Sequence, residues 1–204
     1  MDALPSHSYG LWPGCAFAAL GALRLPYVTC DRLPAFQSLI DNPEYGGTVN
    51  SMTPNEDFGG EGNPNLITGE QYQALVDAHV MFKDMAADPY LASAGIASDW
   101  PVGRGCWQSA DGQCIIWFGE EDQLRIMCMK KGTVLNEVFD RLKAMLDTVE
   151  KIDGIAFATS DKYGYVTSCP SNLGTGMRAS VHVKVPHLTA DGTDAKAKAI
   201  CKPV

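Results

Sequence analysis

The residues best suited to chemistry in this sequence are three consecutive carboxylates, the Glu-Glu-Asp run at 120–122. They separate an apolar run, 114–118, from an alternating run, 123–129. Alternation with a period of two is typical of a half-buried strand. We therefore expect two strands that flank an acidic turn, with Arg125 on the polar face of the second. Adjacent carboxylates repel one another unless cations or a substrate compensate. The alternative is a solvated acidic turn without chemistry.

A second group of candidate residues is cationic. The run 178–185 alternates, with Arg178 and His182 on its polar face. If this strand lies in the same sheet as Arg125, the two guanidiniums and the imidazole point into one space. The fork of an arginine matches phosphate oxygens in bidentate geometry, and the polar loop 171–176 can add backbone N–H groups. A cationic pocket beside carboxylates indicates a reaction that joins an anion to a cation. The alternative for Arg178 is a solvated sheet face.

The surrounding patterns predict the elements that must position these residues. Thr68 to Gln71 form a capping box that opens a helix ending near Asp84, with His79 on its apolar face. Asp111-Gly112 is a tight hairpin signal. Thr133 opens a second helix, and a second hairpin spans 155–169. Sequential hairpins interrupted by single helices predict an α+β fold, an antiparallel sheet flanked by helices on one face.

Residues 1–62 differ in character from the rest of the chain. They contain an apolar patch, 15–25, which predicts a short docking helix or, as the alternative, a targeting segment. The Gly/Pro/Asn-rich stretch 43–64 predicts a linker or a partner-contact segment. We therefore divide the chain into an N-terminal docking or linker segment, 1–62, and a domain, 63–204.

Composition excludes several classes of function. The net charge of −8 and the absence of a basic tract predict no nucleic-acid partner. No apolar run approaches the roughly 20 residues of a transmembrane segment. The sequence has seven cysteines, an odd number, and none of them has CxxC spacing. This favours free thiols in the cytoplasm or another reducing intracellular compartment, with targeting to an organelle as the alternative. The histidine spacing predicts no zinc site.

Five stretches, in order, resemble the catalytic domain of the phosphagen kinases, the ATP:guanidino phosphotransferases that include arginine kinase and creatine kinase. The stretch 117–126, Trp-Phe-Gly-Glu-Glu-Asp-Gln-Leu-Arg-Ile, resembles the family signature Trp-x-Asn-Glu-Glu-Asp-His-Leu-Arg. Residues 169–175, Cys-Pro-Ser-Asn-Leu-Gly-Thr, resemble the family's cysteine loop, and 178–184 resembles the strand after it. The stretches 79–83 and 100–105 match further upstream.

The resemblance implies roles for individual residues. Glu121 matches the first catalytic glutamate, which holds and deprotonates the guanidinium, and Cys169 matches the reactive thiol. Arg125 and Arg178 match arginines that grip nucleotide phosphates. The histidines matching positions near the nucleotide are His79 and His182. The implied ligands are ATP or ADP, Mg²⁺ and a guanidino substrate. Mg²⁺ would bridge the phosphates with few direct protein ligands, so no metal-binding residue is implied.

The sequence also departs from the family pattern. Gly119 stands where the family has asparagine, and Gln123 where it has histidine. We find no Ser-x-Arg-x-Arg segment before Thr68, and no second catalytic glutamate or further strand after Lys184. We therefore expect a truncated phosphagen kinase-like domain whose phosphoryl transfer is impaired or lost. The alternative is a non-catalytic structural subunit or nucleotide-binding module, in which a protein partner covers the exposed sheet edge.

Overall fold

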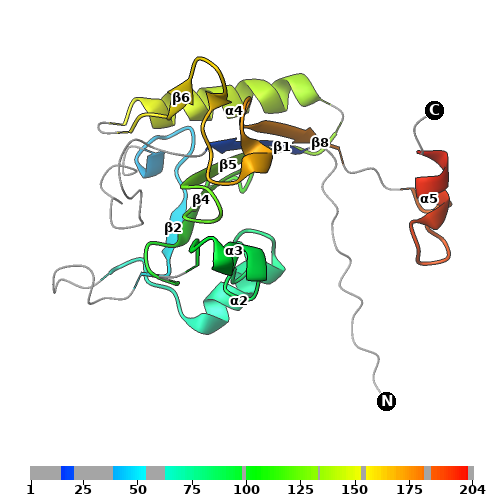
Figure 1. The fold of residues 1–204 in the computed structure, drawn as a ribbon, viewed down its shortest axis with the longest axis horizontal. Coiled ribbons are helices and arrows are strands. Elements are labelled where there is room, and N and C mark those ends of the chain that lie inside the picture. Colours follow the sequence, from blue (N-terminus) through cyan, green and yellow to red (C-terminus); the bar gives the residue numbers. More distant parts are fainter. Residues whose placement is uncertain are drawn as a thin grey trace.

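A six-stranded antiparallel sheet, ordered β2-β3-β4-β5-β1-β8, organises the molecule (Figure 1). The structure, a computed structural model, describes residues 15–20, 39–53, 63–97, 100–132, 134–152, 155–181 and 185–201, and only the backbone of 15–20. The strands of the sheet are β1 Cys15–Leu20, β2 Thr48–Ser51, β3 Gly105–Gln108, β4 Cys114–Phe118, β5 Leu124–Met129 and β8 Met177–Ser180. A separate pair joins β6 Thr159–Ser160 to β7 Gly164–Tyr165. The helices are α2 Gly69–Asp77, α3 Pro89–Ser93, α4 Leu135–Glu150 and α5 Ala195–Ile200, with a 3₁₀ turn, η3, at Pro170–Asn172. The predicted α+β class and antiparallel sheet are confirmed.

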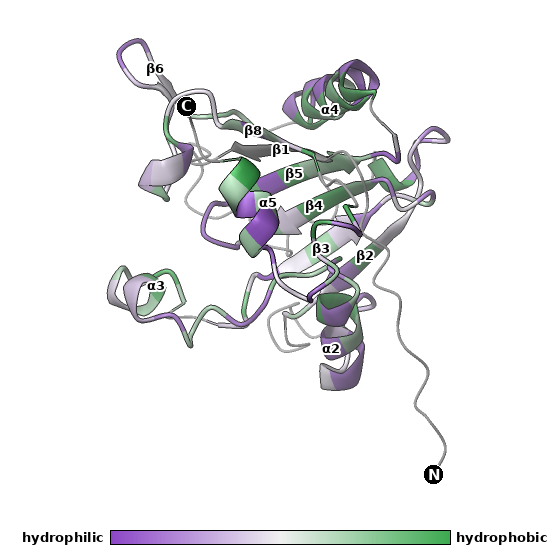
Figure 2. Ribbon diagram, turned by 90° about the vertical axis from the view of Figure 1, so that its right-hand side faces the viewer, coloured by the Kyte–Doolittle hydropathy of each residue, from purple (hydrophilic) through white to green (hydrophobic). Residues whose placement is uncertain are grey.

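The sheet has a core on each of its faces. Strand β5 shows why, because Leu124, Ile126 and Cys128 pack in the core under α4, whereas Met127 packs in a second core with Val76 of α2. Figure 2 shows α4 and α2 on opposite sides of the sheet. The sequence predicted helices on one face only, and this detail was wrong. Strands β4 and β5 are almost continuously apolar, so both faces of the sheet must be shielded from water by other elements.

The apolar patch 15–25 was predicted as a docking helix, and this prediction was wrong for the part that the structure describes. Residues 15–20 form β1, which pairs with β5 on one side and β8 on the other. A six-residue segment that hydrogen-bonds to two neighbouring strands gains more from the ladder than from a local helix, so tertiary context decides its state. The division at residue 62 stays a prediction, but β1 and β2, both N-terminal to it, belong to the main sheet. Strand β2 also lies inside the stretch predicted as a linker.

Helix α2 begins where the capping box predicted. Thr68 Oγ1 accepts the Gln71 N–H at 3.2 Å, and the Gln71 side chain accepts the Thr68 N–H at 2.8 Å. The helix ends at Asp77 rather than near Asp84, because His79 takes a left-handed conformation with φ of 58°. His79 therefore lies on the turn that leaves α2, which frees its side chain from the helix face.

None of the helices in the described part of the chain combines the length and the apolar character that a membrane crossing requires.

Candidate active site

The acidic turn is fixed at its first residue by backbone geometry. Gly119 has φ of +67°, and its N–H donates to the Gln123 carbonyl at 3.0 Å, which closes the hairpin between β4 and β5. Arg104, buried beneath the turn, donates from Nε to the Gly119 carbonyl at 3.0 Å. Asparagine tolerates the left-handed region better than most residues. Gly119 in place of the family's asparagine therefore keeps the conformation while losing a side chain.

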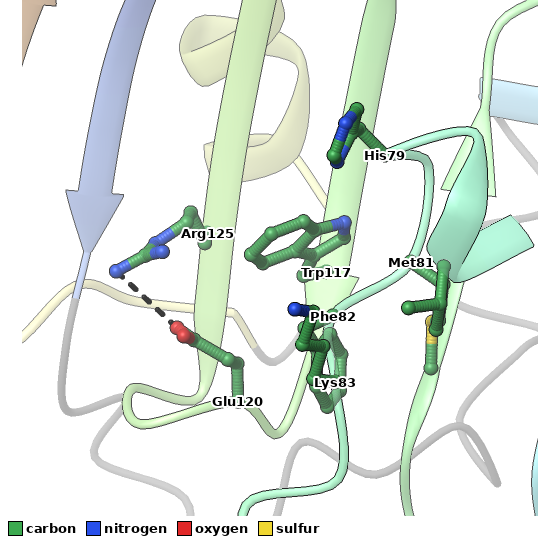
Figure 3. Close-up of a pocket in the computed structure, with 8 residues that line it drawn as sticks. His79, Met81, Phe82, Lys83, Trp117, Glu120 and Arg125 are labelled. Carbon is green, nitrogen blue, oxygen red and sulfur yellow. Dashed lines mark ion pairs between the residues drawn. The ribbon is translucent and has the colours of Figure 1, made fainter. Parts of the chain in front are cut away.

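Arg125 is held by three neighbours on the site face of β5. Its Nη2 lies 2.7 Å from Glu121 Oε1 and 3.3 Å from Glu120 Oε2. Its guanidinium also lies over the Trp117 ring, 5.4 Å from the ring centroid. Figure 3 shows Arg125 and Glu120 pointing toward each other beside Trp117. Strand pairing sets this arrangement, because Trp117 and Arg125 are register partners in β4 and β5.

Glu120 is the most perturbed carboxylate of the turn. Its Oε2 is buried and, in the described structure, receives no hydrogen bond, although Arg125 pairs with it electrostatically. Burial raises the pKa of Glu120 above its usual value, and the nearby charges of Glu121 and Asp122 act in the same direction, against the lowering effect of Arg125. Perturbed carboxylates of this kind cluster at functional sites.

Asp122 joins the acidic turn to the cysteine loop. Its side chain is 2% exposed, and its Oδ1 accepts the backbone N–H groups of Ser168 at 2.6 Å and Cys169 at 3.2 Å. Its Oδ2 accepts from Asn172 Nδ2 at 2.7 Å. With three charge-assisted hydrogen bonds, this buried carboxylate acts as a structural clamp between the acidic turn and the loop.

Glu121 is tied to the loop that carries Cys169. Asn172 Nδ2 also donates to Glu121 Oε1 at 3.1 Å, so the oxygen that pairs with Arg125 also contacts the loop that carries Cys169. Cys169 is partly exposed, and its Sγ lies 3.0 Å from Ser171 Oγ. The site thus presents a carboxylate and a thiol on one connected frame.

A pocket of about 300 Å³ opens beside Arg125 and Glu120. Its other wall comes from the exit of α2, including His79, Phe82 and Lys83 (Figure 3). Trp117 anchors this wall, since its Nε1 donates to the Val80 carbonyl at 2.7 Å. The predicted site residues His79 and Arg125 therefore share one cavity.

Arg178 lies on the same face of the sheet as Arg125. Position 17 of β1 is the register partner of both Met127 and Arg178, and directly paired residues share a face. The Cα atoms of the two arginines are thus separated by two strand spacings, roughly 10 Å, and two residues along the strand, roughly 7 Å. The prediction that the two arginines belong to one sheet is confirmed. Arg178 is exposed, unlike Arg125. The predicted site residue His182 lies outside the described residues.

Three residues that organise the candidate site were missed by the sequence reasoning: Glu120, Asp122 and Asn172. The matching motifs contained all three, but nothing in the spacing showed that the two motifs hydrogen-bond to each other. In the ranges that the structure describes, no group of three or more His, Cys, Asp or Glu side chains is arranged to hold a metal ion.

The fold and this site define a class of protein, an antiparallel α+β domain with an acidic hairpin facing a cysteine loop. Residues 50–204, more than half of the chain, match the family model described as ATP:guanido phosphotransferase, C-terminal catalytic domain. The chain belongs to this family, the phosphagen kinases.

Individual relatives agree with this membership. The chain is 50% identical to an arginine kinase of Anthopleura japonica over 115 residues, which is 56% of this chain and 16% of that protein. It is 43% identical to a creatine kinase M-type of Torpedo marmorata over 127 residues, 61% of this chain and 33% of that protein. The chain thus spans between a sixth and a third of the length of these relatives.

A solved structure shares the fold. The duplicated taurocyamine kinase of Schistosoma mansoni with bound transition state analog components has a TM-score of 0.67 at 32% identity, covering 93% of this chain and 25% of that one.

Proposed function

We propose that this site serves reversible phosphoryl transfer between ATP, bound with Mg²⁺, and a guanidino substrate. The observation that carries the proposal is the link Arg125–Glu121–Asn172, which unites a cation for phosphate, a carboxylate for a guanidinium and the loop of the reactive thiol. In phosphoryl transfer the protein contributes chiefly positioning and charge neutralisation, and this frame supplies both.

Glu121 is the proposed base. Among the described residues, Arg125 and Asn172 both donate to Oε1, so Oε2 is the oxygen that a guanidinium would approach. The carboxylate would hold the guanidinium and accept a proton from the attacking nitrogen. A positioned base contributes typically 10²–10⁴-fold to a rate. Cys169, in the loop that Asn172 ties to Glu121, would place a thiolate beside the positive charge of the substrate.

Arg125 and Arg178 are the proposed phosphate ligands. Arg125 is already oriented by two carboxylates and a tryptophan ring, and Arg178 faces the same side from two strands away. His79, in the wall of the neighbouring pocket, would contact the nucleotide. His182, predicted for the same role, keeps that role as a prediction from sequence.

The second candidate is a nucleotide-binding module with impaired or no turnover. Strand β1 favours it, because Cys-Ala-Phe-Ala-Ala-Leu brings no cation between the two arginine-bearing strands. The glycine and glutamine at 119 and 123 also replace side chains that the family carries in the acidic turn. Loss of a phosphate-binding arginine costs roughly 10³-fold or more in this chemistry, so phosphate binding can survive where catalysis does not.

Two measurements on the same chain separate these candidates. Coupled assays with arginine, creatine and taurocyamine measure transfer from ATP, and calorimetry measures ADP binding. Transfer that falls at least about 100-fold in Glu121→Gln supports the enzyme. ADP binding without transfer supports the module. The matched control is Glu150→Gln, which changes an exposed glutamate at the end of α4. Equal transfer rates in the two variants would remove Glu121 from the base role. A wild-type chain that does not bind ADP would contradict both candidates.

A protein partner at the sheet edge belongs to the module candidate. Strand β8 lies at one end of the sheet order, with Met177, Arg178 and Ala179 exposed. An exposed edge strand is a template for pairing with another chain.

The predicted reducing intracellular compartment fits the free thiols of the described cysteines and stays a prediction.

A further inference from the structure

Two cysteines that the proposed reaction does not use lie side by side on the opposite face of the sheet. Cys114 of β4 and Cys128 of β5 are register partners, and their Sγ atoms are 3.4 Å apart. Both belong to the core under α4, and they are 0% and 1% exposed. Directly opposite residues on antiparallel strands have Cα atoms about 4.5–5.5 Å apart, which falls inside the range of about 4.4–6.8 Å for a disulfide.

An arginine donates a hydrogen bond to one of the two sulfurs. Arg141 of α4 donates from Nε to Cys114 Sγ at 3.1 Å, while its Nη2 pairs with Asp111 Oδ2 at 2.6 Å. Asp111 itself is fixed by the hairpin, since its Oδ1 accepts from Ser109 Oγ at 2.7 Å. The ion pair is partly exposed, 28% for Arg141 and 41% for Asp111. The arginine that contacts Cys114 thus itself reaches solvent at this edge of the core.

The environment makes the two thiols unequal. The hydrogen bond from Cys128 and the charge of Arg141 lower the pKa of Cys114, although burial and Asp111 oppose them. The same hydrogen bond and burial raise the pKa of Cys128. Within the described part of the chain, Tyr45 also interacts electrostatically with both cysteines, and burial raises its own pKa. Cys114 is thus the more acidic thiol of the pair, because the Nε–H of Arg141 is directed at its sulfur.

Cys106 shows what burial does without these partners. It is 0% exposed, and among the described residues Asn50 donates to its sulfur from Nδ2 at 3.9 Å. Burial raises the pKa of Cys106 to about 12. A thiol in that state is inert toward oxidants because the thiolate is the nucleophile. Cys106 is therefore an internal reference for the pair.

We propose that Cys114 and Cys128 are an oxidative modification site for peroxide, at which Cys114 is attacked first and Cys128 closes a cross-strand disulfide. The Cys114 thiolate attacks one oxygen of hydrogen peroxide, the O–O bond breaks, and the hydroxide that leaves takes up the proton that Cys114 lost on ionisation, which gives the first water. The Cys128 sulfur then attacks the sulfenic acid, the S–O bond breaks, and the leaving hydroxyl takes the Cys128 thiol proton to give the second water. Two thiols are oxidised, one peroxide is reduced, and two waters form in total. The sulfurs must approach by about 1.4 Å to reach the disulfide length.

The test is peptide mapping of the folded full chain after graded hydrogen peroxide, with free thiols alkylated after unfolding. We expect a Cys114–Cys128 linked peptide at doses that leave Cys106 free. Cys128→Ser should stop at a sulfenic acid on Cys114, trapped by dimedone, and Cys114→Ser should give no adduct on Cys128. The matched control is Cys201→Ser, which removes an exposed thiol and should leave the linked peptide unchanged. Free Cys114 and Cys128 at doses that fully oxidise Cys201 would overturn the proposal.

A second measurement tests the part of Arg141. Arg141→Gln removes the positive charge beside Cys114 and so raises the pKa of Cys114. The pH at which oxidation of the pair becomes fast should therefore be higher in this variant than in wild type. Lys143→Gln, a neighbouring exposed site on α4, is the control, and circular dichroism checks that each variant is folded. An unchanged pH profile in Arg141→Gln would remove the arginine from the proposal.

Discussion

The two arginine-bearing strands of the site face are built very differently. Arg125 lies on β5 inside the sheet, beside a turn in which all three carboxylates have an ion-pair or hydrogen-bond partner. Arg178 lies on β8, an edge strand whose first three residues are exposed. We call the first region, residues 117–125 together with residues 168–172, the clamped half. We call the second region, β8, the open half.

The difference teaches which part of the site is organised before a ligand arrives. In the clamped half, hydrogen bonds from the cysteine loop and the charge of Arg125 offset the mutual repulsion of the acidic turn. Preorganised dipoles and charges cost no reorganisation at the moment of reaction. In the open half, Arg178 would be ordered by the ligand, so part of the binding free energy would be spent on that ordering.

Loss of the clamp should have the largest effect. Asp122→Ala leaves three donors without their buried acceptor, so we expect a loss of roughly 3–5 kcal/mol in the free energy of unfolding. Urea denaturation measures this loss, and hydrogen exchange should show reduced protection at the Ser168 and Cys169 amides. Asp161→Ala, at an exposed turn, is the control. A loss under about 1 kcal/mol would show that the clamped half is not held by Asp122.

The two arginines should differ in their contributions to nucleotide affinity. Arg125→Ala should weaken ADP binding by roughly 10- to 100-fold, because it removes an oriented charge-assisted contact. Arg178→Ala should cost tenfold or less, and its effect should shrink at high salt because exposed charges are screened. Calorimetry at two salt concentrations gives both numbers, with Lys143→Ala as the control. A larger loss for Arg178 than for Arg125 would reverse the comparison.

Gly119 tests the backbone of the clamped half. Gly119→Val places a β-branched side chain at a φ of +67°, and a Cβ there would lie 3.3 Å from Arg104 Cδ and from the Gly103 carbonyl. We expect a loss of about 1–3 kcal/mol in stability, and a smaller loss for Gly119→Asn. Gly192→Val is the matched control, with φ of +75° and open space around its Cβ. Equal losses at both positions would assign the whole effect to backbone strain and none to the contacts under the turn.

The smallest effect should come from the charge on Glu120. Its raised pKa means that the folded state binds the proton more tightly, so the contribution of Glu120 to stability falls as pH rises from the unfolded value through the folded value. Each unit of pKa difference corresponds to about 1.4 kcal/mol. Glu120→Gln should remove this slope and gain stability relative to wild type at pH 7, with little difference near pH 4. Thermal unfolding across that range measures the gain, against Glu150→Gln. A gain at acidic pH only would contradict the sign.

Local patterns predicted much of the fold because their causes are local. The capping box at Thr68 and the hairpin at Asp111-Gly112 rest on contacts within a few residues, and the apolar stripe of α4 is a periodicity that can be seen within a few helical turns. The end of α2 was missed because a left-handed residue, His79, stops the helix, and no glycine or proline marks it. Strand β1 was missed because its state depends on two strands more than 100 residues away in the chain.

The sequence by itself determined the family and the acidic turn between two strands, and it named the candidate site residues, because motif residues and short-range periodicity are written in order along the chain. Only the tertiary structure decided that β1 separates the arginine strands, that Asp122 and Asn172 bind the acidic turn to the cysteine loop, and that Cys114 meets Cys128. Each of these depends on strand register and packing between distant segments, and register is set by the whole sheet rather than by any one of its strands.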